Sequence, residues 1–354
     1  MAYFQHHDSY FAESDKPHHR ITAEEAARVM ARQQQDTIRI ELSKLAGDEY
    51  LEDIMQHMRQ MEVYCHIDVH RISSANNVKE ETLPDASLID MQREIQWFMR
   101  PYLIDFLIEA HGAFGLLPET LFLTVNLLDR YCSKRVVYKQ HYQLVGCAAL
   151  LIAAKYGDEK DRVPQIHELK NMCCGLYDAG MFTQMEMHVL NTLDWIIGHP
   201  TVDFFSQLMV AEEGGDQEVA HMAAYLCEIA LFHRDFVSTK PSVMARSSFA
   251  LARAILGRSE VNDGGWDQTE SVTLITLSHH LHQPSPTLAQ KYLTTSFSHV
   301  SQKLAKFMTE QAAIARRAAN LAQPINKHTR NIYNTPQIGH SAMEFYCYGC
   351  TSIW

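Results

Sequence analysis

Residues 99–159 read MRPYLIDFLIEAHGAFGLLPETLFLTVNLLDRYCSKRVVYKQHYQLVGCAALLIAAKYGDE. Three runs of helix-forming apolar residues fill this segment, and only short breaks separate them. Because breaks this short make neighbouring helices pack together, we expect a helical bundle. Arg100, Asp129 and Lys155 lie at the ends of these runs beside residues that should be buried, where a charge usually needs a partner. The segment has almost no side chains suited to catalysis, which indicates a binding module.

The third run, Leu144–Ala154, carries small residues around much of its circumference. Small residues let other helices approach closely from several sides, so we expect this helix to be the centre of the bundle. A similar run, Val243–Ala252, occurs about 100 residues later, and aligning the two predicts a duplicated helical unit. Lys155 then falls opposite Ala254. The second unit lacks this charge, which favours a role for Lys155 outside the bundle.

The composition is that of a globular chain and argues against some functions. A length of 354 residues predicts two folded units with tails, at about 150 residues per domain. The net charge of −11 argues against a grip on nucleic acid, which depends on clustered Lys and Arg. The N-terminus lacks the features of a signal peptide, and no run of about 18 uncharged apolar residues could span a membrane. We therefore expect an intracellular protein with reduced cysteines and no membrane partner.

The sequence offers no complete set of residues for a metal or a cofactor. Cys347 and Cys350 form a lone CxxC without a second pair at zinc-site spacing. His279, His280 and His282 lack a nearby Cys or carboxylate set, so we expect a surface cluster. The motifs GxxxxGK[ST], HExxH and GxSxG are missing. We therefore expect no cofactor, no metal and no enzymatic activity.

The phrases MRPYLIDFLIEAH, LFLTVNLLDRY and QLVGCAALLIAAKY, in this order and spacing, resemble the cyclin box. The resemblance continues through residues 181–205, and residues 49–65 are similar to the helix that precedes the box in cyclins. The most similar members are fungal cyclins of the Cln and Puc type, which act early in the division cycle. The resemblance implies an all-α fold of tandem cyclin-like helical repeats with flanking N- and C-terminal helices.

The expected organisation follows from the resemblance and the breaks in the pattern. We predict a partly helical N-terminal extension at 1–48, a pre-box helix and linker at 49–96, an N-terminal cyclin box at 97–198, a C-terminal cyclin-like repeat at 199–300, a C-terminal helix at 301–323 and a mobile tail at 324–354.

The resemblance also implies the function. Cyclins bind and activate a cyclin-dependent serine/threonine protein kinase and perform no chemistry themselves, so we expect a regulatory subunit in the nucleus and cytoplasm that promotes early cell-cycle progression. In the family, a Lys that closes the third helix of the box and a Glu in the fifth contact the kinase, and these correspond to Lys155 and Glu186. Ile54 and Met58 on the preceding helix are expected to take part. The alternative is a cyclin-fold transcription-associated factor, against which the acidic charge argues.

Two further sets of residues follow from the resemblance. Arg100 and Asp129 correspond to a buried ion pair that braces the first two helices of the box. Many cyclins also carry a shallow groove that captures docking motifs of substrates or inhibitors. The matching positions here are Met99, Leu103, Phe106, Glu109, Tyr142 and Gln143. Tyr102 and Tyr142 stand where small aliphatic residues are usual, so the groove is expected to be altered, and core packing explains its apolar members about as well.

Overall fold

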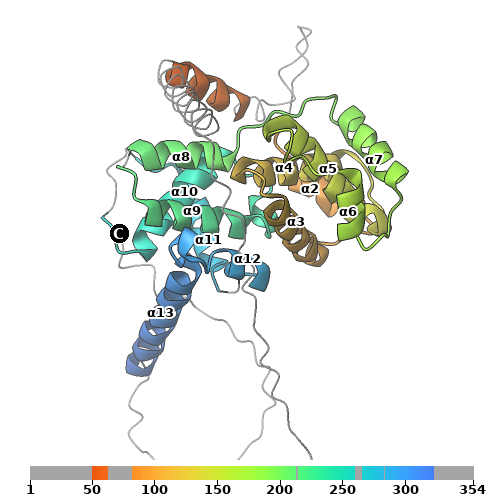
Figure 1. Ribbon diagram of the computed structural model, residues 1–354. Helices are drawn as coiled ribbons and strands as arrows, with labels where there is room; N and C mark the ends of the chain where they lie inside the picture. Colours follow the sequence, from red (N-terminus) through yellow and green to blue (C-terminus); the bar gives the residue numbers. More distant parts are fainter. Residues whose placement is uncertain (1–49, 63–81, 213, 260–264, 283, 323–354) are drawn as a thin grey trace, which may run out of the picture. The chain divides into compact units, whose positions relative to one another are not determined.

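The computed structural model (Figure 1) describes residues 50–62, 82–212, 214–259, 265–282 and 284–322. The chain divides into two compact units, residues 1–57 and 58–354. Residues 50–57 are the described part of the first unit and are helical. All regular structure in the described residues is helical, which confirms the all-α prediction. None of the described helices is both long and apolar enough to cross a membrane.

The second unit is a succession of helices joined by short loops. They are α2 (Ala86–Asp90), α3 (Arg100–Phe114), α4 (Pro118–Lys134), α5 (Tyr142–Gly157), α6 (Ile166–Met172), α7 (Ala179–Thr192), α8 (Val202–Glu212), α9 (Gln217–Ala230), α10 (Pro241–Ile255), α11 (Gln268–His279), α12 (Pro286–Lys291) and α13 (Val300–Ala322). A short 3₁₀ turn, η5 (Arg234–Phe236), follows α9.

Proline and glycine set several helix boundaries. Pro101, Pro118 and Pro241 lie in the first turns of α3, α4 and α10, where a missing N–H costs nothing. Gly115 ends α3 with a φ of +61°, a left-handed conformation that glycine adopts without a Cβ clash. The helix lengths are therefore largely encoded locally.

Each repeat is built around its third helix. In the first repeat, α5 packs against α3, α4 and α7, and every residue of Leu144–Ala154 is buried. The approach is closest at Gly146, where a Cβ would lie 2.9 Å from Cδ1 of Leu103. In the second repeat, α10 packs in the same way against α8, α9 and α11. The tandem arrangement of α3–α7 and α8–α12 confirms the predicted duplication.

Arg100 forms a buried ion pair within the first repeat and a hydrogen bond to the second. The Arg100 guanidinium donates to both carboxylate oxygens of Asp129, at 2.5 and 2.8 Å, and 3% and 6% of the two side chains are exposed. Arg100 Nε donates a third hydrogen bond, of 2.7 Å, to the backbone oxygen of Leu231, which follows α9. Arg100 therefore links α3 and α4 to the C-terminal end of α9.

The segment around η5 contacts α2 and the end of α11. Arg234 forms an exposed ion pair with Asp90 at the end of α2. His233 stacks on His280, with ring centroids 3.8 Å apart, and His280 Nε2 lies 3.0 Å from a carboxylate oxygen of Asp235. His280 thus packs against η5 instead of belonging to a simple surface cluster with its sequence neighbours.

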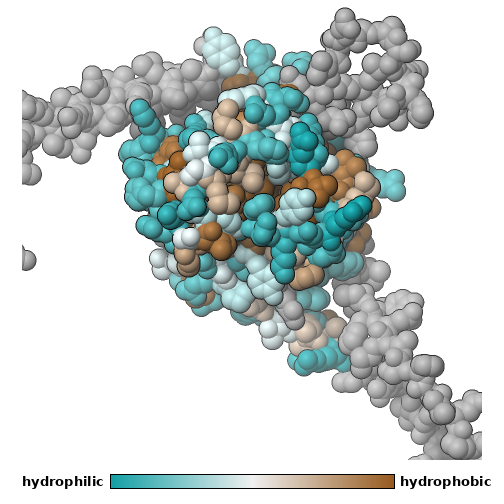
Figure 2. All heavy atoms as spheres, turned by 90° about the vertical axis from the view of Figure 1, so that its right-hand side faces the viewer, coloured by the Kyte–Doolittle hydropathy of each residue, from teal (hydrophilic) through white to brown (hydrophobic). Residues whose placement is uncertain are grey.

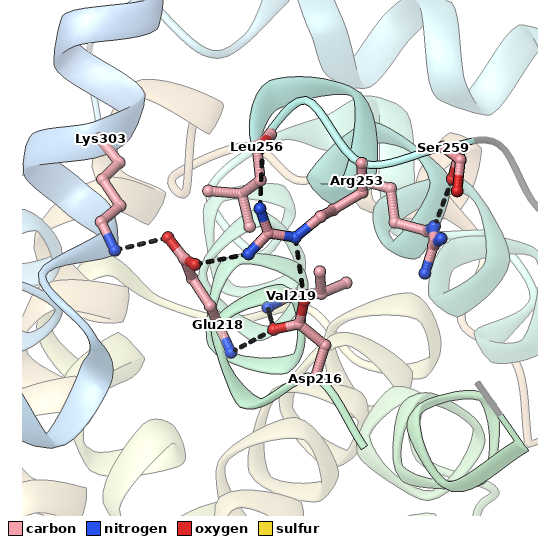
Figure 3. Close-up of polar contacts among 8 residues, drawn as sticks. Asp216, Glu218, Val219, Arg253, Leu256, Ser259 and Lys303 are labelled. Carbon is pink, nitrogen blue, oxygen red and sulfur yellow. Dashed lines mark hydrogen bonds and ion pairs between the residues drawn. The ribbon is translucent and has the colours of Figure 1, made fainter. Parts of the chain in front are cut away.

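Helix α13 is anchored by its first turns (Figure 3). Val300 and Leu304 are buried, and Lys303 donates to Glu218 at the start of α9. Arg258, beyond α10, pairs with Glu218 and with Asp216, whose pKa this hydrogen bond lowers. From Thr309 onward almost all described side chains of α13 are exposed. The helix is thus fixed to the second repeat at its N-terminal end.

We predict that Arg100→Met destabilises the protein by about 3–5 kcal/mol, because it leaves the Asp129 carboxylate buried without its partner. The free energy of unfolding in urea measures this. The double variant Arg100→Met with Asp129→Leu should recover much of the loss, since it removes both charges. Arg234→Met, at the exposed pair, is the control and should cost far less. Equal losses for Arg100→Met and Arg234→Met would contradict the assignment.

We predict that His233 makes the protein less stable in mild acid. Burial, with the neighbouring His280 and Arg100, lowers the pKa of His233 from 6.5 to about 4, and Asp235 only partly opposes this. Between pH 6.5 and pH 4, His233 is therefore protonated in the unfolded chain and neutral in the folded protein. The free energy of unfolding falls as the pH drops through this range. Between pH 7 and pH 5, the free energy of unfolding of the wild type should therefore fall by more than that of His233→Gln. A difference that is independent of pH would refute the prediction.

Candidate functional site

The central helix of the first repeat ends in a charge at the surface. The residues of α5 from Leu144 to Ala154 are buried, and half of the Lys155 side chain is exposed (50%). Because the helix is covered on all sides over this run, Lys155 is the first residue after it that can reach solvent. A long Lys side chain in this position keeps its stem on the apolar surface and its ammonium in water.

Lys155 meets Glu186, which α7 contributes. The distance between Lys155 Nζ and Glu186 Oε1 is 2.5 Å, and 11% of the Glu186 side chain is exposed. Helix α7 packs directly against α5, which brings the two together although 31 residues separate them. A mostly buried carboxylate thereby fixes the direction of a half-exposed ammonium. The structure places the predicted pair side by side, and its contact with a kinase stays a prediction.

Two exposed apolar residues stand next to this pair in the sequence. Tyr156 follows Lys155 and is 60% exposed, and Met187 follows Glu186 and is 45% exposed. Neither was singled out from the sequence, because an apolar residue in a helical pattern is usually part of the core. Their position directly after the two charged residues was the available signal. The face with α6 and α7 in Figure 1 is turned to the viewer in Figure 2, where apolar side chains lie scattered among hydrophilic ones.

Ile54 and Met58 lie on the helical segment 50–62. The Ile54 side chain is exposed (37%) and Met58 is partly buried. The part that either residue takes in binding a kinase stays a prediction. The rest of the predicted helix, residue 49 and residues 63–65, lies outside the described residues.

The predicted docking groove is divided between the surface and the core. Leu103 is 5% exposed and packs under Gly146, and Tyr142 is also buried. Met99, Phe106 and Gln143 are partly buried. Leu103 and Tyr142 therefore serve the core and offer little surface to a ligand.

The aromatic surface near the start of α3 comes from two other residues. Tyr102 is 76% exposed and Phe98 is 71% exposed. Tyr102 neighbours Leu103 in the sequence, but one residue turns a side chain by about 100° around a helix, so one of them is outside and the other inside. The apolar surface of this region thus comes from the exposed Phe98 and Tyr102 and the partly buried Met99 and Phe106, in place of the full predicted set.

Helix α12 covers the more C-terminal part of α3. Ser285 donates a 2.6 Å hydrogen bond to Asp105, and Thr287 donates a longer one, of 3.4 Å, to Glu109. Burial raises the pKa of Asp105. Glu109 remains exposed, so its second carboxylate oxygen is still available to a ligand.

Nothing in the described part of the chain forms a metal-binding group of three or more His, Cys, Asp or Glu side chains. Cys147 and Cys173 are buried, with 3.5 Å between their sulfur atoms, and are free thiols. The predicted CxxC of Cys347 and Cys350 lies outside the described residues.

Family models match most of the chain. Residues 70–198 match the cyclin N-terminal domain, and residues 200–343 match the cyclin C-terminal domain. A solved structure, a viral cyclin from herpesvirus saimiri, is similar in fold. It has a TM-score of 0.50 and 18% sequence identity, and the match covers 57% of this chain and 92% of that one.

Several curated relatives are fungal cyclins. The G1/S-specific cyclin CCN1 of Candida albicans is 46% identical over 206 residues, which cover 52% of this chain and 30% of the relative. Cyclin puc1 of Schizosaccharomyces pombe is 41% identical over 153 residues, which cover 43% and 38%. The G2/mitotic-specific cyclin cdc13 of the same yeast is 32% identical over 265 residues, which cover 73% and 51%. The chain thus spans between about a third and a half of the length of these relatives.

With both domains matched in order and the two repeats present in the structure, the chain belongs to the cyclin family, and fungal G1/S-specific cyclins are among its relatives.

Proposed function

We propose that this chain is a regulatory subunit that binds and activates a cyclin-dependent serine/threonine protein kinase early in the cell cycle. Cyclins as a family are regulatory subunits and not enzymes, and relatives named G1/S-specific cyclins support the timing. The single observation that carries the proposal is the Lys155–Glu186 pair, which sits at the surface end of the central helix of the first repeat.

The geometry of this pair suits recognition of a helix end. A Lys ammonium has three N–H donors, and Glu186 accepts from one of them, which leaves two for backbone carbonyls of a partner. The second carboxylate oxygen of Glu186 can accept from backbone N–H groups. Because Glu186 already holds the ammonium in place, less side-chain freedom is lost when the kinase binds.

Activation needs no chemistry from this chain. A kinase exchanges between inactive and active arrangements, and the active one requires a specific ion pair between its ATP-positioning Lys and a Glu on a mobile helix. A partner that binds the active arrangement more tightly shifts the population toward it by that difference in affinity. Tyr156 and Met187 are exposed and follow Lys155 and Glu186 in the sequence, so they offer apolar area that can add to this affinity.

The exposed residues around the start of α3 support a second, finer role in docking substrates or inhibitors. Met99 and Tyr102 lie at the N-terminal end of α3, away from the part that α12 covers. We also propose that the protein works in the nucleus and the cytoplasm, where its kinase partner and their substrates would be found. Fluorescence microscopy of the tagged protein tests this location.

We predict that Lys155→Glu abolishes binding of the kinase without unfolding the protein. The change places a second carboxylate beside Glu186 and removes the donors to the kinase helix, while the side chain is half exposed and outside the core. Affinity purification from cells measures kinase recovery, and circular dichroism checks the fold. Lys306→Glu makes the same change of charge on an 80% exposed residue of α13 and should leave recovery unchanged. Undiminished kinase recovery with Lys155→Glu would defeat the assignment.

We predict that Met99→Ala with Tyr102→Ala separates docking from activation. Removing the exposed Tyr102 side chain and the partly buried Met99 side chain should lower kcat/KM by about tenfold or more for a substrate that carries a docking motif. A short substrate peptide without that motif should be phosphorylated at the wild-type rate, because Lys155 and Glu186 are intact. Phosphorylation assays with both substrates measure the ratio. An equal loss for both would indicate damage to kinase binding instead.

A further inference from the structure

Two loops of the first repeat lie side by side and carry a surface that the proposed function does not use. One follows α2 (residues 91–94) and the other follows α4 (residues 134–139). The Gln92 side chain joins them: its Nε2 donates to the backbone oxygen of Arg135 at 2.6 Å, and its Oε1 accepts from the backbone N–H of Val137 at 3.0 Å. Gln92 itself is buried. The two loops thus hold each other in a fixed shape.

A second side chain completes this attachment. Glu94 accepts a 3.0 Å hydrogen bond from the backbone N–H of Lys139. Because Gln92 and Glu94 bind only backbone atoms of the second loop, they leave its side chains free. The residues that alternate with them, Met91 and Arg93, are exposed. The paired loops therefore present their side chains outward from a rigid base.

The outward side chains include large apolar residues. Met91 is 72% exposed, Val136 is 68% exposed and Tyr138 is 55% exposed. Core packing explains none of these three, since each keeps more than half of its surface in water. Large exposed apolar side chains on a rigid surface are candidates for a site of interaction.

The same two loops also carry four positive charges. Arg93, Lys134, Arg135 and Lys139 are all exposed. Among the described residues, no carboxylate lies within 4.0 Å of the side-chain nitrogens of Arg93, Arg135 or Lys139, and Lys134 has only a 3.9 Å approach to Asp194. The neighbouring acidic residue Glu94 is engaged with a backbone N–H. In a chain with a net charge of −11, Arg93, Arg135 and Lys139 form a local positive field that no carboxylate of the described residues neutralises by direct contact.

We propose that the paired loops, residues 91–94 and 134–139, are a docking surface for an acidic peptide segment of a partner protein, one in which Asp or Glu flanks large apolar residues. The apolar residues of such a segment cover Met91, Val136 and Tyr138, and its carboxylates pair with the cations of the same loops. The backbone attachment pre-organises the surface, so binding costs little ordering of the loops. This surface includes neither Lys155, Glu186 nor any residue of α3.

A short fluorescein-labelled peptide in which Asp and Glu alternate with Leu and Phe tests the proposal, with the full chain and fluorescence anisotropy. We expect saturable binding that weakens as salt rises, because exposed charges are screened. Arg135→Glu with Lys139→Glu should weaken binding by about tenfold or more. Met91→Ser with Val136→Ser should also weaken it several-fold. The folded loops survive these changes, since Gln92 and Glu94 bind the backbone of the second loop.

Matched controls make the outcome decisive. Lys160→Glu with Lys306→Glu makes the same change of charge on other exposed residues and should leave binding within about twofold of wild type. The proposal is overturned if this control weakens binding as much as the loop variant, if a peptide with Asn and Gln in place of Asp and Glu binds equally well, or if the acidic peptide does not bind. Duplex DNA that binds with the same dependence on Arg135 and Lys139 would overturn the choice of partner.

Discussion

The Arg100 guanidinium forms hydrogen bonds that link the two repeats to each other. It spends two donors on Asp129 and a third on the backbone oxygen of Leu231, so it binds the first two helices of one repeat and the end of a helix in the other. A buried ion pair on its own adds little net stability, because desolvation offsets the attraction. Its larger effect is on geometry, since a planar guanidinium satisfies all three acceptors in only one arrangement.

The second constraint on the first repeat is its central helix, α5, which other helices cover on every side from Leu144 to Ala154. Residues Leu144–Ala154 of α5 are all buried, so the helix can neither rotate nor slide without opening voids. Lys155 is the first residue beyond this cover, and α7 places Glu186 beside it. The position of the charged pair is thus a consequence of core packing. A change in the core can therefore weaken a contact at the surface without touching it.

The surface is divided into regions with different chemistry. A carboxylate and an ammonium meet at the end of α5, and their sequence neighbours Tyr156 and Met187 are exposed, whereas exposed aromatic residues dominate near the start of α3. The loops 91–94 and 134–139 combine apolar side chains with the cations Arg93, Arg135 and Lys139, which have no carboxylate within 4.0 Å among the described residues. In a protein with a net negative charge, such a positive region favours the approach of negatively charged ligands.

The sequence alone determined the helices, their duplication and the central position of Leu144–Ala154, because these follow from local spacing and from small residues within one run. The resemblance to cyclins named Lys155 and Glu186, but only the tertiary structure showed that they touch. It also decided that Leu103 is inside and Tyr102 outside. A periodic pattern fixes the angles between side chains on a helix, whereas neighbouring helices decide which side is covered. Contacts such as Gln92 with the loop after α4 join residues more than 40 positions apart, and no local pattern encodes such a pairing.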